Sequence, residues 1–180
     1  MRTFLREFLI TLIMAGVFVL LLQSAIAIPP SEVVSSSMEP TLQIGQRLII
    51  SKIAYVFHEP ERGDIIVFNP PHTQQGDFIK RIIGLPGESV EIKQGTVYIH
   101  KQDGDILALD EPYIKEPPNN DFQGGIIPEN EYFVLGDNRN NSSDSRTGWT
   151  VPRENIDGKA WLRHWPPSEW GLAPNYSFEE

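Results

Sequence analysis

Three segments of the chain carry side chains that could take part in covalent chemistry, and the first is a run of serines. Ser35, Ser36 and Ser37 stand together before Met38. A serine hydroxyl is a weak nucleophile until a neighbouring base removes its proton, so the chain must also offer a base. Histidine is the commonest one, but none of the four histidines lies in a segment that otherwise resembles a site. Taken alone, such a serine cluster is more often a solvated loop.

A lysine within an apolar run is the second candidate. Lys80 belongs to the run Phe-Ile-Lys-Arg-Ile-Ile at residues 78–83, which precedes a Gly-Leu-Pro-Gly turn. Successive side chains of a strand point to opposite faces, so either Lys80 or Arg81 faces the core. Burial favours the neutral amine, which makes a buried lysine a usable base. The alternative is a lysine on the solvent face of a strand, which is the common case.

The third segment is a loop of small polar and charged residues at 136–146. It reads Gly-Asp-Asn-Arg-Asn-Asn-Ser-Ser-Asp-Ser-Arg. This composition favours a loop held by internal hydrogen bonds and by an Asp–Arg ion pair. A calcium-binding loop is excluded, because the glycine at its sixth position and the acid at its twelfth are missing.

Short runs of β-branched and aromatic residues must position these groups. The expected strands are 47–50, 64–68, 78–83, 89–92 and 96–99, with further candidates at 133–135 and 159–162. Gln94-Gly95 predicts a tight hairpin between two of them. Residues 103–130 are rich in Pro, Gly, Asn and acids and predict a long connection. The predicted fold class is therefore mainly β, with bent antiparallel sheets forming a barrel-like catalytic domain, preceded by one transmembrane helix.

The N-terminus predicts that membrane-spanning helix at residues 8–28. The run has no charge, has the length that crosses a bilayer core, and ends before two prolines. Because Arg2 and Arg6 precede it, residues 1–7 should be cytoplasmic and the β-domain, residues 29–180, extracytoplasmic, in a single-pass protein whose partners include the lipid bilayer. The alternative is a cleaved secretory signal, because residues 25–27 read Ala-Ile-Ala, although the apolar run is longer than such signals usually have.

Composition excludes other classes of protein. The formal net charge of −9 and the pI near 4.9 argue against a nucleic-acid partner, which would require a basic face. There is no cysteine, which rules out disulfides, a thiol nucleophile and thiolate metal sites. The 180 residues suit one domain and an anchor.

Four segments, taken together, resemble the conserved blocks of type I signal peptidases and follow the order of that family. They are residues 37–42, 62–68, 78–88 and 136–146. The resemblance extends from the anchor to about Trp149. It implies a membrane-bound serine endopeptidase that removes signal peptides from exported preproteins after small-x-small sites, without a metal or another cofactor.

The resemblance also implies a role for each matching residue. Ser37 would be the nucleophile and Lys80 its general base, while the Ser35 hydroxyl and the Ser37 N–H would form the oxyanion hole. The residues that would orient the base or support the site are Ser142, Asp144, Arg146 and Asp137. The residues that would line shallow pockets for the substrate are Val33, Val34, Met38, Leu42, Phe78 and Ile79.

Three positions depart from the pattern of the family. Val34, Ser36 and Asn140 stand where many members have proline, glycine and aspartate. None of them removes a group that the reaction needs.

Two other interpretations stay open at this point. Self-cleaving repressors are also Ser–Lys peptidases of related β architecture, but they carry a DNA-binding helical domain that this acidic chain does not show. An anchored β-domain that binds or assembles without catalysis would also fit the pattern of strands.

Overall fold

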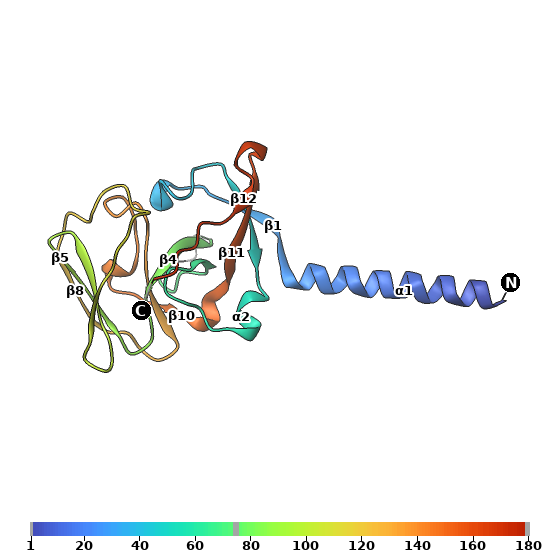
Figure 1. Ribbon diagram of the computed structural model, residues 1–180, viewed down its shortest axis with the longest axis horizontal. Helices are drawn as coiled ribbons and strands as arrows, with labels where there is room; N and C mark the ends of the chain where they lie inside the picture. Colours follow the sequence, from blue (N-terminus) through green and yellow to red (C-terminus); the bar gives the residue numbers. More distant parts are fainter. Residues whose placement is uncertain (1, 74–75, 179–180) are drawn as a thin grey trace.

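The computed structural model describes residues 2–73 and 76–178, and the side chains of residues 2–3 and 20–30 lie outside this description. A long helix, α1 (Arg2–Ala25), stands apart from a β-domain (Figure 1). None of the helices in the described part of the chain is long and apolar enough to cross a membrane. The predicted anchor at 8–28 includes residues whose side chains are outside that part.

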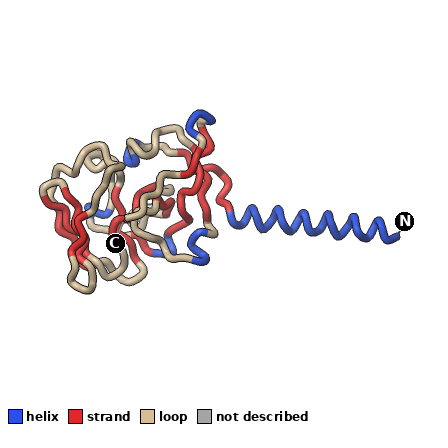
Figure 2. The backbone as a smooth tube through the Cα atoms, viewed as in Figure 1, coloured by secondary structure: helices blue, strands red, loops and turns tan. Residues whose placement is uncertain are grey.

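The β-domain consists of two antiparallel sheets (Figure 2). The larger sheet has the strand order β1-β2-β11-β3-β4-β9-β10, with β12 paired to β11. Its strands are β1 (Ile26–Glu32), β2 (Arg47–Ser51), β3 (Ile65–Phe68), β4 (Phe78–Gly84), β9 (Glu131–Leu135), β10 (Val151–Pro152), β11 (Ile156–Trp165) and β12 (Gly171–Leu172).

The smaller sheet lies at the end of the domain away from α1 (Figure 1). Its order is β7-β6-β5-β8, with the strands β5 (Ser89–Lys93), β6 (Thr96–His100), β7 (Ile106–Ala108) and β8 (Phe122–Ile126). The short helices are α2 (Ala54–Phe57), η1 (Ser36–Met38), η2 (Ser145–Thr147), η3 (Arg153–Asn155) and η4 (Pro167–Glu169).

The mainly β, antiparallel fold confirms the class expected from the sequence, and each of the seven expected runs contributes to a strand. The tight hairpin is also confirmed. Lys93 pairs with Thr96 across it, and both turn residues have positive φ, 50° at Gln94 and 80° at Gly95. Glycine adopts such a φ without steric cost, and this twist matches that of the flanking strands.

Two predicted boundaries are wrong. The connection predicted at 103–130 contains two short strands, β7 and β8. Two glycines within β8 weaken the sequence signal of a strand. At the N-terminus the helix ends at Ala25, and the two prolines lie within β1. Since proline cannot donate to a sheet, they fall where the pairing of β1 with β2 is irregular, between Ala27 and Ser31.

Strand β4 is buried on both faces, which differs from the expectation that only one of its two basic side chains turns inward. Lys80 is 4% exposed and Arg81 is 0% exposed. Strand β3 pairs with β4 at residues 78–81 on one edge, and β9 pairs with it at residues 81–84 on the other. Each of the two cations must therefore find its partners inside the protein.

Candidate active site

The segment that carries the three serines, residues 35–37, is anchored by neighbouring residues that pack in the hydrophobic core. After β1 the chain continues through Val33, whose N–H donates to the Gln46 carbonyl (2.9 Å), into the short helix η1. Met38 and Leu42, which follow, are almost completely buried in one cluster with residues of β2, β3 and β11. This packing fixes the position of η1, in which Ser37 is the middle residue.

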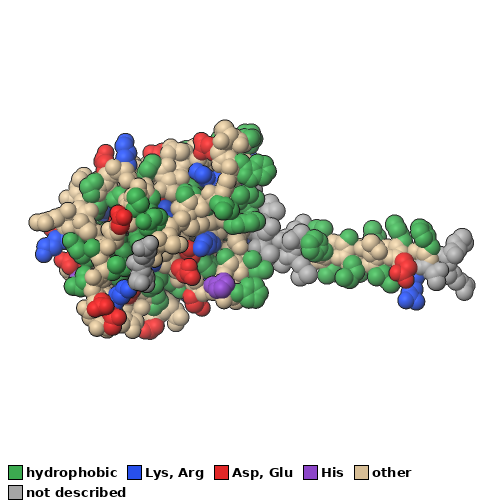
Figure 3. Space-filling view, viewed as in Figure 1, with side chains coloured by type: hydrophobic (Ala, Val, Ile, Leu, Met, Phe, Trp, Pro, Cys, Tyr) green, Lys and Arg blue, Asp and Glu red, His purple; other side chains and the backbone are tan. Residues whose placement is uncertain are grey.

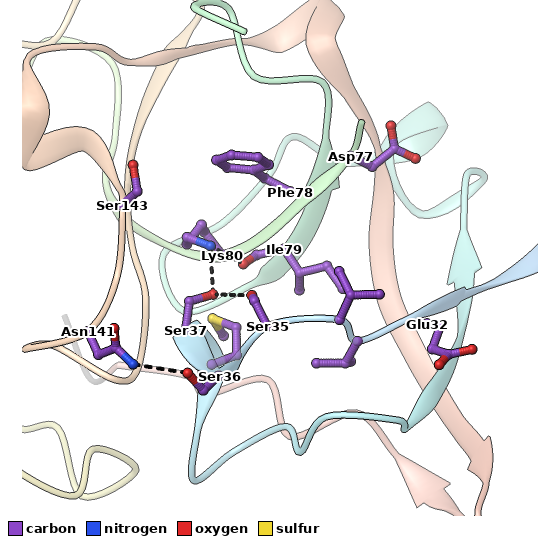
Figure 4. A pocket seen from close by; sticks show the side chains of 13 residues that line it. Glu32, Ser35, Ser36, Ser37, Asp77, Phe78, Ile79, Lys80, Asn141 and Ser143 are labelled. Atoms are coloured by element: carbon purple, nitrogen blue, oxygen red, sulfur yellow. Dashed lines mark hydrogen bonds between the residues drawn. The ribbon is translucent and has the colours of Figure 1, made fainter. Parts of the chain in front are cut away.

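Lys80 and Ser37 meet at the floor of a groove (Figure 4). The Lys80 Nζ donates to the Ser37 Oγ at 2.8 Å and to the Ile79 carbonyl at 2.9 Å. The Ser35 Oγ lies 3.2 Å from the Ser37 Oγ. The structure thus brings together three of the predicted residues although 43 positions separate Ser37 from Lys80.

Burial lowers the pKa of Lys80 from 10.5 to about 8. The carboxylates of Asp144 and Asp137 act in the opposite direction, because negative charge favours the ammonium. The Phe78 ring centroid lies 5.2 Å from the Nζ and forms part of its apolar surroundings. Desolvation is the larger effect, so the neutral amine is accessible near physiological pH.

The loop at 136–147 supports the other side of the serine helix. The Asn138 backbone N–H donates to the Ser37 carbonyl (3.0 Å), and its side-chain amide donates to the Ser36 carbonyl (3.1 Å). The Asn141 amide donates to the Ser36 Oγ (3.0 Å; Figure 4). Asparagine side chains of this loop thereby fix the backbone on which the serine hydroxyl is carried.

An ion pair shapes the same loop from within. The Arg146 guanidinium donates twice to the Asp144 carboxylate, at 2.8 and 2.9 Å, and the Gly136 N–H donates to it at 3.1 Å. Asp144 is 0% exposed. This is the pair predicted from the sequence, and it is adjacent to the site.

Ser142 was expected to orient Lys80, but the structure shows no bond between them. Its Oγ is buried and has no hydrogen-bond partner among the described residues. It lies against Gly136, where a Cβ would overlap the hydroxyl. Ser142 is therefore close to the site, but its expected role is not visible as a contact.

Asp137 pairs with Arg81 inside the protein. The Arg81 Nε and Nη2 donate to the two Asp137 carboxylate oxygens at 2.9 and 2.7 Å, and both side chains are fully buried. A bidentate pair of this kind fixes the geometry of both groups. Because Arg81 follows Lys80 and Asp137 precedes Asn138, the pair connects the strand that carries Lys80 with the loop that holds Ser37.

The groove above the serine and the lysine has a volume of about 320 Å³. The predicted pocket residues that line it are Val33, Val34, Met38, Phe78 and Ile79. Leu42 is not among the lining residues, because its side chain is turned into the core beneath η1 and is 0% exposed.

Several residues that line the groove or support the serines are not predicted by the sequence. Asp77 and Glu32 stand at the end of the groove remote from the lysine, and Asn141 and Ser143 lie on the opposite wall (Figure 4). Asn138 was part of the predicted loop but received no role. Their types are common in solvated loops, so only their place in the fold distinguishes them. Within residues 2–73 and 76–178 no cluster of three or more histidine or acidic side chains is arranged to hold a metal ion.

A buried amine that is hydrogen-bonded to a serine hydroxyl beneath an open groove is the arrangement expected of a serine hydrolase. The family described as signal peptidase, peptidase S26, matches residues 5–165. A probable signal peptidase I-1 of Synechocystis sp. is 43% identical over 97% of this chain and 90% of its own length. The signal peptidase I of Leptolyngbya laminosa is 47% identical over 79% of this chain and 72% of its own. Signal peptidase IB of Staphylococcus aureus is 33% identical over 94% of each chain.

The chain therefore belongs to the signal peptidase family, peptidase S26, and is a serine peptidase.

Proposed function

We propose that this chain is a membrane-anchored signal peptidase I that cleaves preproteins after small-x-small sites, with Ser37 as nucleophile and Lys80 as general base. The observation that carries the proposal is the 2.8 Å hydrogen bond between the Lys80 Nζ and the Ser37 Oγ, both in buried side chains. Signal peptidases are the relatives that this chain resembles along most of its length.

The first step is proton transfer coupled to attack. The neutral amine of Lys80 takes the proton of the Ser37 hydroxyl while the oxygen forms a bond to the scissile carbonyl carbon. With a pKa of about 8, roughly one tenth of the lysine is neutral at pH 7, and this fraction increases with pH. The hydrogen bond to the Ile79 carbonyl holds the Nζ beside the Oγ throughout.

The oxyanion of the tetrahedral intermediate would be stabilised by two donors. The Ser37 N–H lies in the first turn of η1, where a helical N–H has no acceptor within the helix. The Ser35 hydroxyl, which lies 3.2 Å from the Ser37 Oγ, is the second donor. One such donor contributes about 3 kcal/mol to catalysis.

The same lysine completes the turnover. Its ammonium returns the proton to the leaving amine as the peptide bond breaks, which leaves Ser37 acylated by the signal peptide. Water then attacks the ester, with the neutral lysine accepting its proton, and the serine hydroxyl is restored.

The backbone around the groove suits an extended substrate. Strand β4 pairs with β3 through residues 78–81 but with β9 only through residues 81–84, so in the described sheet the edge at 78–80 faces the groove. A substrate strand can add to this edge through main-chain hydrogen bonds. Its side chains alternate, so the residues one and three positions before the cut face the same apolar wall. The shallow surface formed by Val33, Met38 and Ile79 suits small side chains there.

The proposed anchor is residues 8–28, with the N-terminus cytoplasmic and the β-domain extracytoplasmic. The run has no charged residue, and Arg2 and Arg6 precede it. The described apolar side chains of α1 are exposed rather than packed on the β-domain (Figure 3). An exposed apolar helix of this kind gains free energy from lipid.

The proposal is tested by cleavage of a preprotein with an Ala-x-Ala site by the full-length chain in detergent. Ser37→Ala should abolish cleavage, and Lys80→Ala should lower the rate about 10²–10⁴-fold. In the parent protein the rate should rise with pH, be half-maximal near pH 8 and level off at higher pH, because only the unprotonated lysine acts as the base.

Lys93→Ala is the matched control, since it removes an exposed lysine from another strand. It should cleave as the parent does. Undiminished cleavage by the folded Lys80→Ala variant would overturn the proposed mechanism.

A further inference from the structure

The C-terminal segment at 173–178 is bound to the centre of the larger sheet. It follows β12 and lies beyond residues 5–165, which the family match covers. The Ala173 N–H donates to the Trp161 carbonyl (2.8 Å), and its side chain belongs to the same core cluster as Met38 and Leu42 under the serine loop. These contacts order a segment that has few sequence signals of a strand or a helix.

Asn175 bridges two strands where their own pairing ends. Its Oδ1 accepts from the Ile65 N–H of β3 at 2.7 Å, and its Nδ2 donates to the Ala160 carbonyl of β11 at 2.9 Å. The backbone pairing of β3 with β11 reaches only Ile66 and Lys159 on this side. One side-chain amide thus continues the sheet by a further pair of hydrogen bonds.

The next residue of the tail is placed over a glycine. The Tyr176 N–H donates to the Gly63 carbonyl at 3.2 Å. A Cβ on Gly63 would overlap the Tyr176 carbonyl, so the backbones are in direct contact. The Tyr176 ring packs on Tyr113 with 5.3 Å between centroids, and Tyr113 in turn lies 4.0 Å from the Arg81 guanidinium.

The tail thereby completes the surroundings of the buried Arg81. Besides its two bonds to Asp137, the guanidinium donates to the Gly63 carbonyl at 2.8 Å and, from both Nη atoms, to the Pro174 carbonyl at 3.3 Å. A buried guanidinium needs acceptors for all of its five N–H groups. The tail supplies one of these acceptors, the Pro174 carbonyl, and its Tyr176 ring packs on Tyr113, whose own ring lies over the guanidinium.

The Arg81–Asp137 ion pair is linked through the backbone to both Lys80 and Ser37. Arg81 follows Lys80 in β4, and Asp137 precedes Asn138, whose N–H holds the Ser37 carbonyl. A shift of the ion pair would therefore move the strand of the amine and the support of the serine relative to each other.

We propose that residues 173–178 position the Ser37–Lys80 pair by closing the buried shell around Arg81 and Asp137, with Asn175 and Tyr176 as positioning residues. The inference rests on the proposed function of Ser37 and Lys80. It assigns to the tail a part in catalysis although none of its residues lines the groove.

The positioning role has an electrostatic signature. Four charged groups surround Lys80 in two pairs, Asp144 with Arg146 and Asp137 with Arg81, while Asp77 and Glu32 stand at the far end of the groove. Loss of the tail contacts would admit water and loosen the neutralisation of Asp137 by Arg81. Both changes raise the pKa of Lys80 toward its ordinary value.

The test uses full-length Asn175→Ala and Tyr176→Ala, assayed on a soluble Ala-x-Ala peptide across pH 6 to 10. We expect kcat to fall about tenfold, with KM within about twofold, because misplacement of reacting groups acts on the chemical step. The pH of half-maximal kcat should move upward by about half a unit or more. Thermal unfolding of each variant gives the folded fraction, to which the rates are normalised.

The matched controls are Tyr176→Phe, which keeps the ring on Tyr113, and Ser177→Ala, which changes an exposed side chain of the same tail. Both should match the parent in rate and in half-maximal pH. A loss of rate that only follows the unfolded fraction, with the half-maximal pH unchanged, would overturn the positioning role.

Ser37→Ala and Lys80→Ala, run in the same assay, separate the two proposals. Cleavage by folded Lys80→Ala at the parent rate would remove the proposed function. If both active-site variants are inactive while Asn175→Ala and Tyr176→Ala behave like their controls, only the inference about the tail is wrong.

Discussion

Lys80 combines a hydrogen bond to Ser37, the proposed nucleophile, with a buried position that disfavours its own charge. Lys80 is 4% exposed, and burial lowers the pKa of its amine to about 8. In the folded protein at neutral pH the ammonium is therefore held in a place where it is less stable than in water. A buried basic group is therefore expected to lower the unfolding free energy, and the same burial is what makes its neutral form available for catalysis.

Replacement of this lysine should stabilise the protein in a pH-dependent manner. The folded pKa of about 8 lies below the value of 10.5 for the unfolded chain. Between these values the unfolded chain binds more protons, so the parent gains stability as pH rises, by about 3 kcal/mol in total. Lys80→Met lacks this gain. Denaturant unfolding should find it more stable than the parent at pH 7, by about 1–3 kcal/mol after the lost hydrogen bonds are counted.

The advantage of Lys80→Met should shrink between about pH 8 and pH 10, because the neutral lysine of the parent no longer bears the cost of burial. Lys93→Met, at an exposed position of β5, should show no such dependence. If the Lys80→Met advantage grew with pH, the buried amine would not be the source of the effect.

At the level of elements, the loop at 136–147 opposes the desolvation of the lysine. Asp144 is the carboxylate that acts most on Lys80 among those that raise its pKa, and it is held by Arg146 and by the Gly136 N–H. Burial in β4 lowers the pKa of Lys80, the proposed base, and the carboxylates of the loop limit this decrease. Two elements that are remote in the sequence, β4 and the loop at 136–147, therefore determine together the pH range in which we expect activity.

Asp144→Asn should separate these two influences. Loss of the negative charge, with Arg146 left nearby, should lower the pKa of Lys80 below about 8, so half-maximal activity should occur at a lower pH than in the parent. Breaking the largely buried pair should also lower the unfolding free energy by about 3 kcal/mol. A pH–rate profile measured well below the unfolding temperature, with exposed Asp110→Asn as control, checks the shift. A shift toward higher pH would contradict the electrostatic role of Asp144.

The sequence predicted elements well where local pattern decides, and less well where distant contacts do. Alternating β-branched residues and the Gln94-Gly95 turn identified β5 and β6, because these depend on neighbours in the chain. Arg81 and Pro174 are 93 positions apart, and no local sequence pattern predicts the hydrogen bond between them. Nor does any local pattern predict the contacts of Asn175 with β3 and β11. Leu42 is an apolar residue next to the serine segment, as a pocket residue would be, but its side chain packs into the core.

At the scale of the molecule, the β-domain presents apolar side chains toward the helix. Figure 3 shows hydrophobic side chains along α1 and along the margin of the β-domain nearest to it. Trp165 and Trp170, on either side of η4, are 49% and 69% exposed. Tryptophan is favoured at membrane interfaces, so this margin would rest on the bilayer if α1 is the anchor, as we propose. The groove would then be held at the height where a membrane-bound signal peptide presents its cleavage site.

This arrangement predicts different effects on two substrates. In Trp165→Ser/Trp170→Ser the proposed anchor should keep the protein in the membrane, but the domain should lose the interfacial burial that we expect to fix its orientation. Cleavage of a preprotein inserted in vesicles should fall about tenfold, which corresponds to about 1.4 kcal/mol. Cleavage of a soluble peptide with the same site should stay within about twofold of the parent, because neither tryptophan lines the groove. Ile126→Ser, at a 78% exposed position of β8 at the opposite end of the domain, should cleave both substrates normally. Equal losses on both substrates would mean that the tryptophans act on the fold of the site and not on its height above the membrane.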